Sequence, residues 1–398
     1  MKVSRLNLQE QNQKYSFDIS LLFVTLFLCV FGLIMVYSAS YYTAEMKGLG
    51  GSYYFKRQLI SDLVGIAGLL ILAFVPYRLL KWAVIPAYAA AIVLMVLTNY
   101  TSLGHTAGGR TRWINLFGVT FQSAEVVKIA VILVSAYLIF AFGREYRGWK
   151  LWLSLLVFAL IPTALVFSND LSSAVIILAI PLVMILLVND NKTLSAVMIF
   201  LIIAAAVGIL LMKFMSLDRL MKVGDWLVEH TPLHEYQVRR LYVWNDPTYD
   251  AQGDGYQVLQ GLYAIGSGGV FGKGLGGGTQ KLGFVPEASN DMIFSILCEE
   301  LGLFGALALI LLYIFMLFRM GNIAGKAQDV FGSLLVIGVM TQIAVQAVFH
   351  IGVVTNIFPN TGISLPFISY GGTSSAFLLA EIGMVISVGR GNTLRKKQ

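Results

Sequence analysis

Long apolar runs separated by short polar stretches dominate the chain and predict its secondary structure. Ten runs of about 16–28 residues are each long enough to cross, or nearly cross, a hydrocarbon core of roughly 30 Å as a helix. They cover residues 17–39, 58–76, 82–99, 124–142, 151–168, 172–188, 194–213, 291–318, 329–355 and 374–389. The pattern therefore predicts an all-α polytopic membrane protein with about ten transmembrane helices, organised as one integral membrane domain over residues 1–398.

The composition supports this interpretation. Hydrophobic residues make up 57% of the 398 residues, charged residues only 12%, and the mean hydropathy is +0.77. A soluble domain carries roughly 25% charged residues. The first run is followed by Ser38-Ala39-Ser40, which resembles a signal-peptide cleavage site. Its apolar stretch exceeds the roughly 7–15 residues of a signal h-region, so we expect an uncleaved first helix.

The distribution of Lys and Arg predicts the orientation in the membrane. An even number of spans places both termini on one side. The termini and the short loops on that side carry 15 Lys and Arg residues, against 5 in the short loops opposite. The positive-inside rule then puts both termini in the cytoplasm. The net charge of +7 is accordingly a topology signal, and no nucleic-acid partner is expected.

The largest polar segment, residues 214–290, becomes an extracytoplasmic loop between the seventh and eighth helices. Its first part, Leu217 to Trp244, has apolar residues at helical spacing and predicts amphipathic helices at the interface. Its second part, residues 264–280, is glycine-rich and predicts a flexible or tightly turned loop, with no Walker A pattern. His230 and His234 are four apart, but Pro232 lies between them and zinc is not favoured.

The stretch from Phe284 to Gly302 starts polar and becomes apolar at Met292. This places Asp291 where a solvent-exposed loop meets a membrane helix. Asp commonly caps a helix N-terminus. Charges at this depth in a membrane protein are costly and usually functional. Asp291 is therefore either a capping residue or a catalytic or ligand-binding carboxylate.

Other ionisable residues are predicted at the same depth. Glu125 and Lys128 are three apart on a helix and form either a structural ion pair or an anion or proton site. Asp170 lies in a very short turn, where it suits an N-cap. Four such groups at one depth predict a single water-accessible cavity.

Two loops beside the spans bear on this cavity. Arg112 and Trp113 suit an interfacial anchor, or else a wall for a sugar ring with the Arg reaching phosphate. Residues 356–373 contain two prolines and three glycines, and we expect this non-helical segment to help form the cavity.

Four further acids lie inside the spans. Asp62 and Glu381 are expected to face the bundle interior, protonated or hydrogen-bonded, and no catalytic role is assigned to them. Glu299 and Glu300 are expected to serve packing or helix–helix bonding.

Six stretches of the chain resemble a known family when they are taken in order. They are RWINLFG, FQSAEVVKIA, NDLSSA, GYQVLQGLYAIGSGGVFGKGLGGGTQ, FVPEASNDMIFSILCEELG and PNTGISLPFISYGGTS. The chain resembles the SEDS family (shape, elongation, division and sporulation), whose members include FtsW, RodA and SpoVE, over about residues 17 to 392. The resemblance implies a ten-helix peptidoglycan glycosyltransferase that polymerises lipid II on the outer face of the cytoplasmic membrane, for division, elongation or sporulation.

The resemblance also implies site residues. The essential acid of the Pro-Glu-x-x-x-Asp motif falls on Asp291, the Arg-Trp pair on Arg112 and Trp113, and the remaining charged motif positions on Glu125, Lys128 and Asp170. Lys273 in the glycine-rich stretch and Glu287 in the acidic motif are further substrate-binding candidates. The family's Gln-Pro-Ser-Glu reads Gln122-Ser123-Ala124-Glu125 here, and its Gln-Pro-Asp-Leu-Gly-Thr reads Ser168-Asn169-Asp170-Leu171-Ser172-Ser173. The charged residues are kept while their neighbours differ.

The mechanism that follows is one inverting displacement. An acceptor 4-hydroxyl attacks the anomeric carbon of the donor, and undecaprenyl pyrophosphate leaves. Asp291 is the hypothesised base. Lys128, Arg112, Arg239 or Arg240 are candidates to neutralise the pyrophosphate. A divalent cation, Mg²⁺ or Mn²⁺, is a further candidate, with Asp291 or Asp170 as ligand.

A partner and two alternatives accompany this hypothesis. The family implies a class B penicillin-binding protein as partner, supplying the transpeptidase. A flippase of lipid-linked precursors is the alternative function, and a scaffold that docks a partner is a third.

Overall fold

The computed structural model describes residues 18–107, 110–116, 118–143, 149–167, 169–188, 191–231 and 235–391. Each of the ten predicted spans is a helix: α1 (Ile19–Met46), α2 (Tyr53–Phe74), α3 (Leu80–Tyr100), α4 (Ser123–Phe142), α5 (Trp149–Phe167), α6 (Leu171–Val188), α7 (Lys192–Lys213), α11 (Ile293–Gly325), α12 (Val330–Val354) and α13 (Thr373–Gly391). Within the described ranges, nine of them are long and apolar enough to cross a membrane, and α5 has a shorter apolar stretch, Trp152–Phe167. The predicted polytopic helical fold is confirmed.

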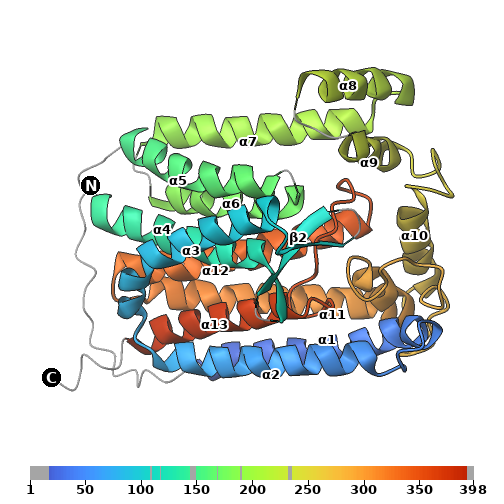
Figure 1. Ribbon diagram of the computed structural model, residues 1–398, viewed down its shortest axis with the longest axis horizontal. Helices are drawn as coiled ribbons and strands as arrows, with labels where there is room; N and C mark the ends of the chain where they lie inside the picture. The colour runs from blue at the N-terminus through green and yellow to red at the C-terminus, as the bar shows by residue number, and fades with distance from the viewer. Residues whose placement is uncertain are drawn as a thin grey trace.

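Polar contacts show which helix ends share a side of the bundle. The Arg319 guanidinium near the end of α11 is 2.8 Å from Asp18, which caps the start of α1. Gln328, just before α12, donates to the carbonyl of Gly391 at the end of α13 (2.6 Å). The starts of α1 and α12 and the ends of α11 and α13 therefore share one end of the bundle, called the terminal end below. The opposite end, on the right of Figure 1 with α8–α10, is called the cavity end.

A small sheet at the cavity end was not predicted. The strands β1 (Gly104–Ala107), β2 (Arg110–Leu116) and β3 (Val119–Gln122) form an antiparallel meander in which Trp113 pairs with His105 and Gln122. β-branched and aromatic residues fill this segment, and such residues favour strands. The expected loop between α3 and α4 is therefore a compact sheet beside the helices (Figure 1).

The segment between α7 and α11 is largely helical. α8 (Leu217–His230) and α9 (Glu235–Asn245) pack together through Leu220, Val238 and Tyr242, which confirms the predicted amphipathic helices. α10 (Tyr256–Gly268) was not predicted, because its glycines suggested a loop. Residues 232–234, and so Pro232 and His234, lie outside the described residues.

α11 is interrupted at Gly302, which has φ +64° and ψ −165°. The interruption frees backbone groups that a continuous helix would pair. The glycine-rich loop supplies their partners: Lys273 N donates to the Glu299 carbonyl (3.0 Å), and Leu303 N donates to the Gly269 carbonyl (3.0 Å). The loop predicted as flexible or tightly turned is thus a tight turn built onto a broken helix.

The non-helical segment between α12 and α13 lies inside the bundle. His350 Nδ1 contacts the Ile363 carbonyl oxygen at 2.6 Å, and Gln346 Nε2 donates to the Ser364 carbonyl at 3.1 Å. Phe367 and Ile368 are buried. Side chains of α12 therefore satisfy backbone that neither water nor a helix would satisfy at this depth.

The two isolated acids inside spans two and ten are both buried. Asp62 accepts hydrogen bonds from Gln58 (2.9 Å) and Ser375 (2.6 Å), which links α2 to α13. Glu381 is fully buried. Both face the bundle interior, as predicted.

Candidate functional site

A cavity of about 940 Å³ lies at the cavity end of the bundle. Its walls come from α2, the small sheet, the starts of α4 and α6, the turn before α11, α12 and the segment between α12 and α13. Six of the predicted site residues line it: Arg112, Trp113, Glu125, Lys128, Asp170 and Asp291. The prediction that 356–373 helps to form the cavity is also confirmed, since Gly362, Ile363 and Ser364 line it.

Asp291 ends a tight turn just before α11. The turn is closed by Asn290 N donating to the Glu287 carbonyl (3.0 Å). Two contacts fix it to the segment before α13: Tyr370 N donates to the Ser289 carbonyl (2.8 Å), and Ser369 Oγ donates to the Asn290 carbonyl (2.8 Å). The backbone beside Asp291 is therefore held from two sides, and the carboxylate is presented to the cavity.

The pKa of Asp291 is raised to about 6. Burial against protein atoms is the largest cause, and the negative charge of Glu287 is the next. Arg112 and Arg240 oppose the rise, and Asp170 adds to it. A carboxylate with a pKa near the working pH can both accept and release a proton, as a general base must.

Arg112, on β2, faces Asp291 across Gly362. Its Nε donates to the Asn169 carbonyl (2.9 Å), and its Nη2 is buried without a hydrogen-bond partner in the described part of the chain. A Cβ built on Gly362 would lie 3.0 Å from Asp291 Oδ2 and 4.0 Å from Arg112 Nη1. A base and a cation with spare hydrogen-bonding capacity thus share one small space, which suits recognition of an anionic group.

Asp170 combines a structural role with a place in the cavity wall. It caps α6, because its Oδ1 accepts from Ser173 N (3.1 Å) and its Oδ2 from Ser173 Oγ (2.9 Å). Gln122 Nε2 also donates to it (2.9 Å), and Arg112 Nε is 3.9 Å away. The N-cap interpretation is correct, and the same carboxylate holds Arg112 in position.

Glu125 and Lys128 form an ion pair of 2.7 Å in the first turns of α4. Both side chains are buried, with exposures of 3% and 1%. Glu125 Oε2 has no partner among the described residues. The pair therefore largely satisfies itself, and both residues also line the cavity.

Three other predicted residues lie outside the cavity lining. Arg239 pairs with Glu235 (3.2 Å) and Asp254 (3.7 Å) on an exposed face of α9. Arg240 Nη1 donates to the Asn360 carbonyl (2.7 Å), and Glu287 is exposed. Arg240 and Glu287 act on the site through their charges, because both shift the pKa of Asp291.

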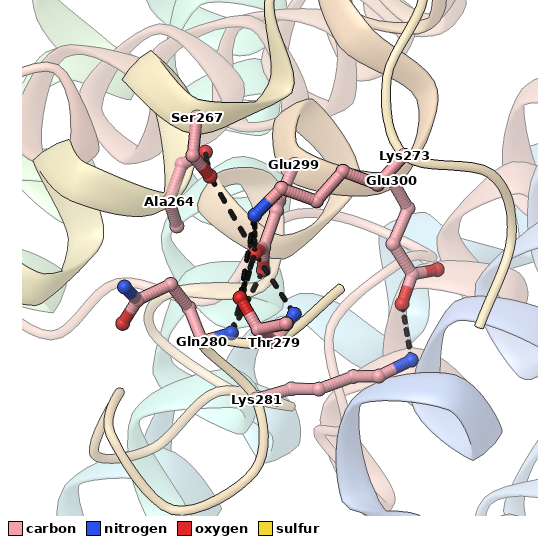
Figure 2. A network of polar contacts seen from close by, with 8 residues as sticks. All are labelled: Ala264, Ser267, Lys273, Thr279, Gln280, Lys281, Glu299 and Glu300. Carbon is pink, nitrogen blue, oxygen red and sulfur yellow. Dashed lines mark hydrogen bonds and ion pairs between the residues drawn. The ribbon is translucent and has the colours of Figure 1, made fainter. Parts of the chain in front are cut away.

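Lys273 belongs to a second polar network, shown in Figure 2. Its ammonium is 2.7 Å from Glu299, whose carboxylate also accepts from the backbone N–H groups of Thr279 (2.9 Å) and Gln280 (3.1 Å). Lys281 pairs with the neighbouring Glu300, which also accepts from Ser38 of α1 (2.7 Å). The structure gives Lys273 an architectural partner, and its substrate-binding role stays a prediction.

Several polar residues of the cavity wall were not predicted as site residues, among them Arg57, His105, Asn290, Gln346 and Tyr370. Arg57 precedes the second predicted span, residues 58–76, by one residue. Its signal was the polar series Arg57, Gln58 and Asp62 at the start of an otherwise apolar span.

The metal-ligating side chains of the cavity do not form a metal site without a further ligand. No group of three or more His, Cys, Asp or Glu side chains in the described ranges could hold a metal ion. Asp170 and Asp291 offer two carboxylates beside Arg112. Mg²⁺ typically uses one or two carboxylates together with substrate phosphates. The residues therefore fit a divalent cation only as a companion of a bound phosphate ligand.

The fold and the site together define a class of protein: a multi-pass membrane protein with a charged cavity at one end of its helical bundle. Residues 19–394 match the FtsW/RodA/SpoVE family, described as "Cell cycle protein". The chain belongs to this family.

Relatives match over nearly the whole chain. It is 34% identical over 377 residues to the "Probable peptidoglycan glycosyltransferase FtsW" of Trichlorobacter lovleyi, covering 94% of this chain and 93% of the relative. It is 33% identical over 383 residues to "Stage V sporulation protein E" of Bacillus subtilis, covering 95% and 98%. A solved chain described under "Structural coordination of polymerization and crosslinking by a peptidoglycan synthase complex" superposes with a TM-score of 0.74 at 25% identity, covering 94% and 98%.

Proposed function

We propose that this chain is a peptidoglycan glycosyltransferase that polymerises lipid II into β-1,4 glycan strands. The observation that carries the proposal is Asp291, a carboxylate with a pKa of about 6 that shares the cavity with Arg112. The relatives' names give the reaction class, and the resemblance to FtsW and SpoVE leaves division, elongation and sporulation open.

The reaction is a single displacement with inversion at the donor's anomeric carbon. The acceptor's 4-hydroxyl oxygen forms the new bond, its proton passes to the Asp291 carboxylate, and the bond to undecaprenyl pyrophosphate breaks. A positioned base contributes roughly 10²–10⁴-fold to such a step. Asp291 then returns the proton to water through the cavity.

The leaving pyrophosphate carries negative charge away from the reacting carbon. Arg112 is the best candidate to stabilise this charge, because its buried Nη2 has no hydrogen-bond partner among the described residues. Arg240 adds a positive potential at Asp291, whereas Lys128 is already neutralised by Glu125 at 2.7 Å. A Mg²⁺ or Mn²⁺ ion would enter with the pyrophosphate, with Asp170 or Asp291 as ligand.

The site faces the outside of the cytoplasmic membrane in this proposal. The excess of Lys and Arg at the terminal end makes that end cytoplasmic, which leaves the cavity end and the segment 214–290 extracytoplasmic. A lipid-linked substrate reaches such a site from the outer leaflet.

A partner is expected to complete the synthesis. The solved chain of similar fold comes from a complex that couples polymerization and crosslinking. We propose a class B penicillin-binding protein as the crosslinking partner, bound within the membrane.

Asp291→Asn tests the proposed role of the base. The purified variant and the wild type are given lipid II, and the glycan strands are measured after the enzymatic removal of unreacted lipid. Asp254→Asn is the matched control, since Asp254 is a half-exposed carboxylate that pairs with Arg239 away from the cavity. Asp291→Asn should lose at least about 100-fold in rate, whereas the control should keep its rate.

Wild-type strand formation by folded Asp291→Asn would refute the role of Asp291. Movement of labelled lipid II across liposomes without any strand formation would identify a flippase instead. A scaffold would neither form strands nor move lipid II across liposomes, even when an active transpeptidase partner is present.

A further inference from the structure

Arg57, near the start of α2, is a cation of the cavity wall. The other Lys and Arg residues of the wall have carboxylate partners: Arg112 has Asp170 at 3.9 Å, and Lys128 has Glu125 at 2.7 Å. No carboxylate of the described residues lies within ion-pair distance of Arg57. Its charge is therefore available to a ligand in the cavity.

The contacts of Arg57 hold it in place without neutralising it. Its guanidinium carbon lies 5.2 Å from the centre of the Tyr53 ring, as in a cation–π contact. Burial raises the pKa of Tyr370, and the guanidinium beside its hydroxyl opposes that rise. Tyr370 in turn donates its backbone N–H to Ser289, two residues before Asp291. Arg57 and the proposed base are thus attached to one segment.

The helix turn around Arg57 is itself anchored to that segment. Gln58 Oε1 accepts hydrogen bonds from the backbone N–H groups of Gly371 (3.2 Å) and Gly372 (3.1 Å). Ser61 Oγ donates to the Gly372 carbonyl. The start of α2 is therefore fixed relative to the cavity and does not depend on the ligand for its position.

The helix face of α2 that carries Arg57 continues along the cavity wall. Ile60, Ser61 and Val64 line the cavity with Arg57, at the spacing of one helix face. Ile60 and Val64 are 62% and 63% exposed. One face of α2 thus carries a cation followed by exposed apolar side chains. Such a face suits an amphiphile with an anionic headgroup and a hydrocarbon chain.

We propose that Arg57 binds the diphosphate of a second polyprenyl-linked substrate, the acceptor, while Arg112 serves the diphosphate of the donor. This inference rests on the proposed glycan polymerisation, in which both substrates carry a diphosphate. The apolar stripe at Ile60 and Val64 receives the start of the acceptor's prenyl chain.

The chemistry of the reaction assigns the two cations. The donor's diphosphate is bonded to the reacting carbon, so it must lie beside the base. Arg112 faces Asp291 across Gly362, whereas the contacts of Arg57 are with Tyr53 and Tyr370. The acceptor's diphosphate is separated from its reacting 4-hydroxyl by two sugar rings. It therefore needs a cation that belongs to the same cavity but lies farther from the base.

A single-linkage assay separates the two substrates. A lipid II analogue blocked at the 4-hydroxyl can act only as donor, and a phosphonate analogue without a leaving group can act only as acceptor. The KM of each is measured with the other at saturation. Arg57→Gln should raise the KM of the acceptor about tenfold or more, the effect of losing one hydrogen bond to a charged group. The KM of the donor and kcat should stay within about twofold of the wild type.

Two further variants control for charge and folding. Lys56→Gln removes a neighbouring positive charge that does not line the cavity, and it should leave both KM values unchanged. Arg57→Lys keeps the charge and should give an acceptor KM between those of the wild type and Arg57→Gln. It also gives a result if the glutamine variant fails to fold.

The outcomes distinguish the inference from the function on which it rests. If the wild type forms no linkage, the proposed function fails. If it does and Arg57→Gln keeps the acceptor KM, or raises only the donor KM, the inference is wrong. The assay is repeated in phosphatidylcholine nanodiscs with and without phosphatidylglycerol. An effect of Arg57→Gln confined to the anionic discs would assign Arg57 to a phospholipid headgroup and overturn the inference.

Discussion

The charge of Glu287 should raise the lower pH limit of activity, in addition to the larger effect of burial. Asp291 has a pKa of about 6 against an ordinary value of 3.8, a rise of about two units or ~3 kcal/mol in favour of the protonated form. Glu287 is the second cause of this rise, after burial. Because Glu287 is exposed and outside the cavity lining, Glu287→Gln should act on Asp291 mainly through its charge.

The sign follows from the role of the base. Only ionised Asp291 can accept the proton, so kcat/KM should rise with pH through about 6 and level off above it. Removing the negative charge lowers the pKa of Asp291. Glu287→Gln should therefore move the rising limb of the pH profile of kcat/KM to lower pH, by a few tenths of a pH unit to about one unit. Below about pH 6 the variant should be faster than the wild type, and added salt should narrow the difference.

The contribution of Asp291 to folding stability changes with pH in the opposite direction to activity. Measuring stability therefore serves as a control. A raised carboxyl pKa means that protonation favours the folded state. This contribution is complete below the ordinary value of 3.8 and is lost as the pH rises through about 6. Titration of Asp291 therefore cannot cause unfolding on the acid side, and loss of activity there reports the base.

The assay is lipid II polymerisation by purified protein between about pH 4.5 and pH 8, with thermal unfolding measured in the same buffers. Glu229→Gln removes an exposed charge of α8 and should leave the limb unmoved. A flat wild-type profile across this range would contradict the assignment of the base. A limb that stays in place or moves upward in Glu287→Gln would contradict the electrostatic argument.

Three other predictions follow from the site. Lys128→Met should destabilise the protein by about 3–5 kcal/mol in chemical unfolding, because it leaves the Glu125 carboxylate buried and unpaired. The double variant with Glu125→Gln should recover most of that stability, and it should stay inactive only if the pair serves the reaction. Gly362→Ala should lower kcat with little change in KM: its φ of +71° disfavours alanine, and the new Cβ would lie 3.0 Å from Asp291 Oδ2. Chelation by EDTA should slow polymerisation without lowering the melting temperature of the substrate-free protein, because the described residues offer no three-ligand site; a fall in melting temperature would contradict this.

The helices were predictable because each span must be apolar throughout its length, a signal that survives any packing arrangement. The sheet at residues 104–122 was not, because its short β-branched run lies between two much stronger helical signals. α10 was missed for a related reason. Its glycines permit close contact with α11, as at Gly268 beside the Cys298 carbonyl, but in the sequence they indicate a loop.

The site was predictable where a charge interrupts an apolar pattern. Glu125, Lys128, Asp170 and Asp291 all stand out in this way, and all four line one cavity. Lys273 has the same signal, yet its partner is Glu299 in a separate network. Spacing along the chain cannot distinguish these cases, because which face of a helix meets which loop depends on tertiary packing.

The interruption at Gly302 divides α11 into two pieces with different relations to the lipid. The longer piece, residues 303–325, is about 35 Å long at roughly 1.5 Å per residue, close to the thickness of a bilayer's hydrocarbon core. The shorter piece, residues 293–301, begins two residues after Asp291, and the glycine-rich loop bonds to both sides of the break, at Glu299 and at Leu303. Tilting of a long span is one response to a bilayer of different thickness. A bend at the break would let the longer piece tilt while Tyr370 and Ser369 hold the turn that carries Asp291.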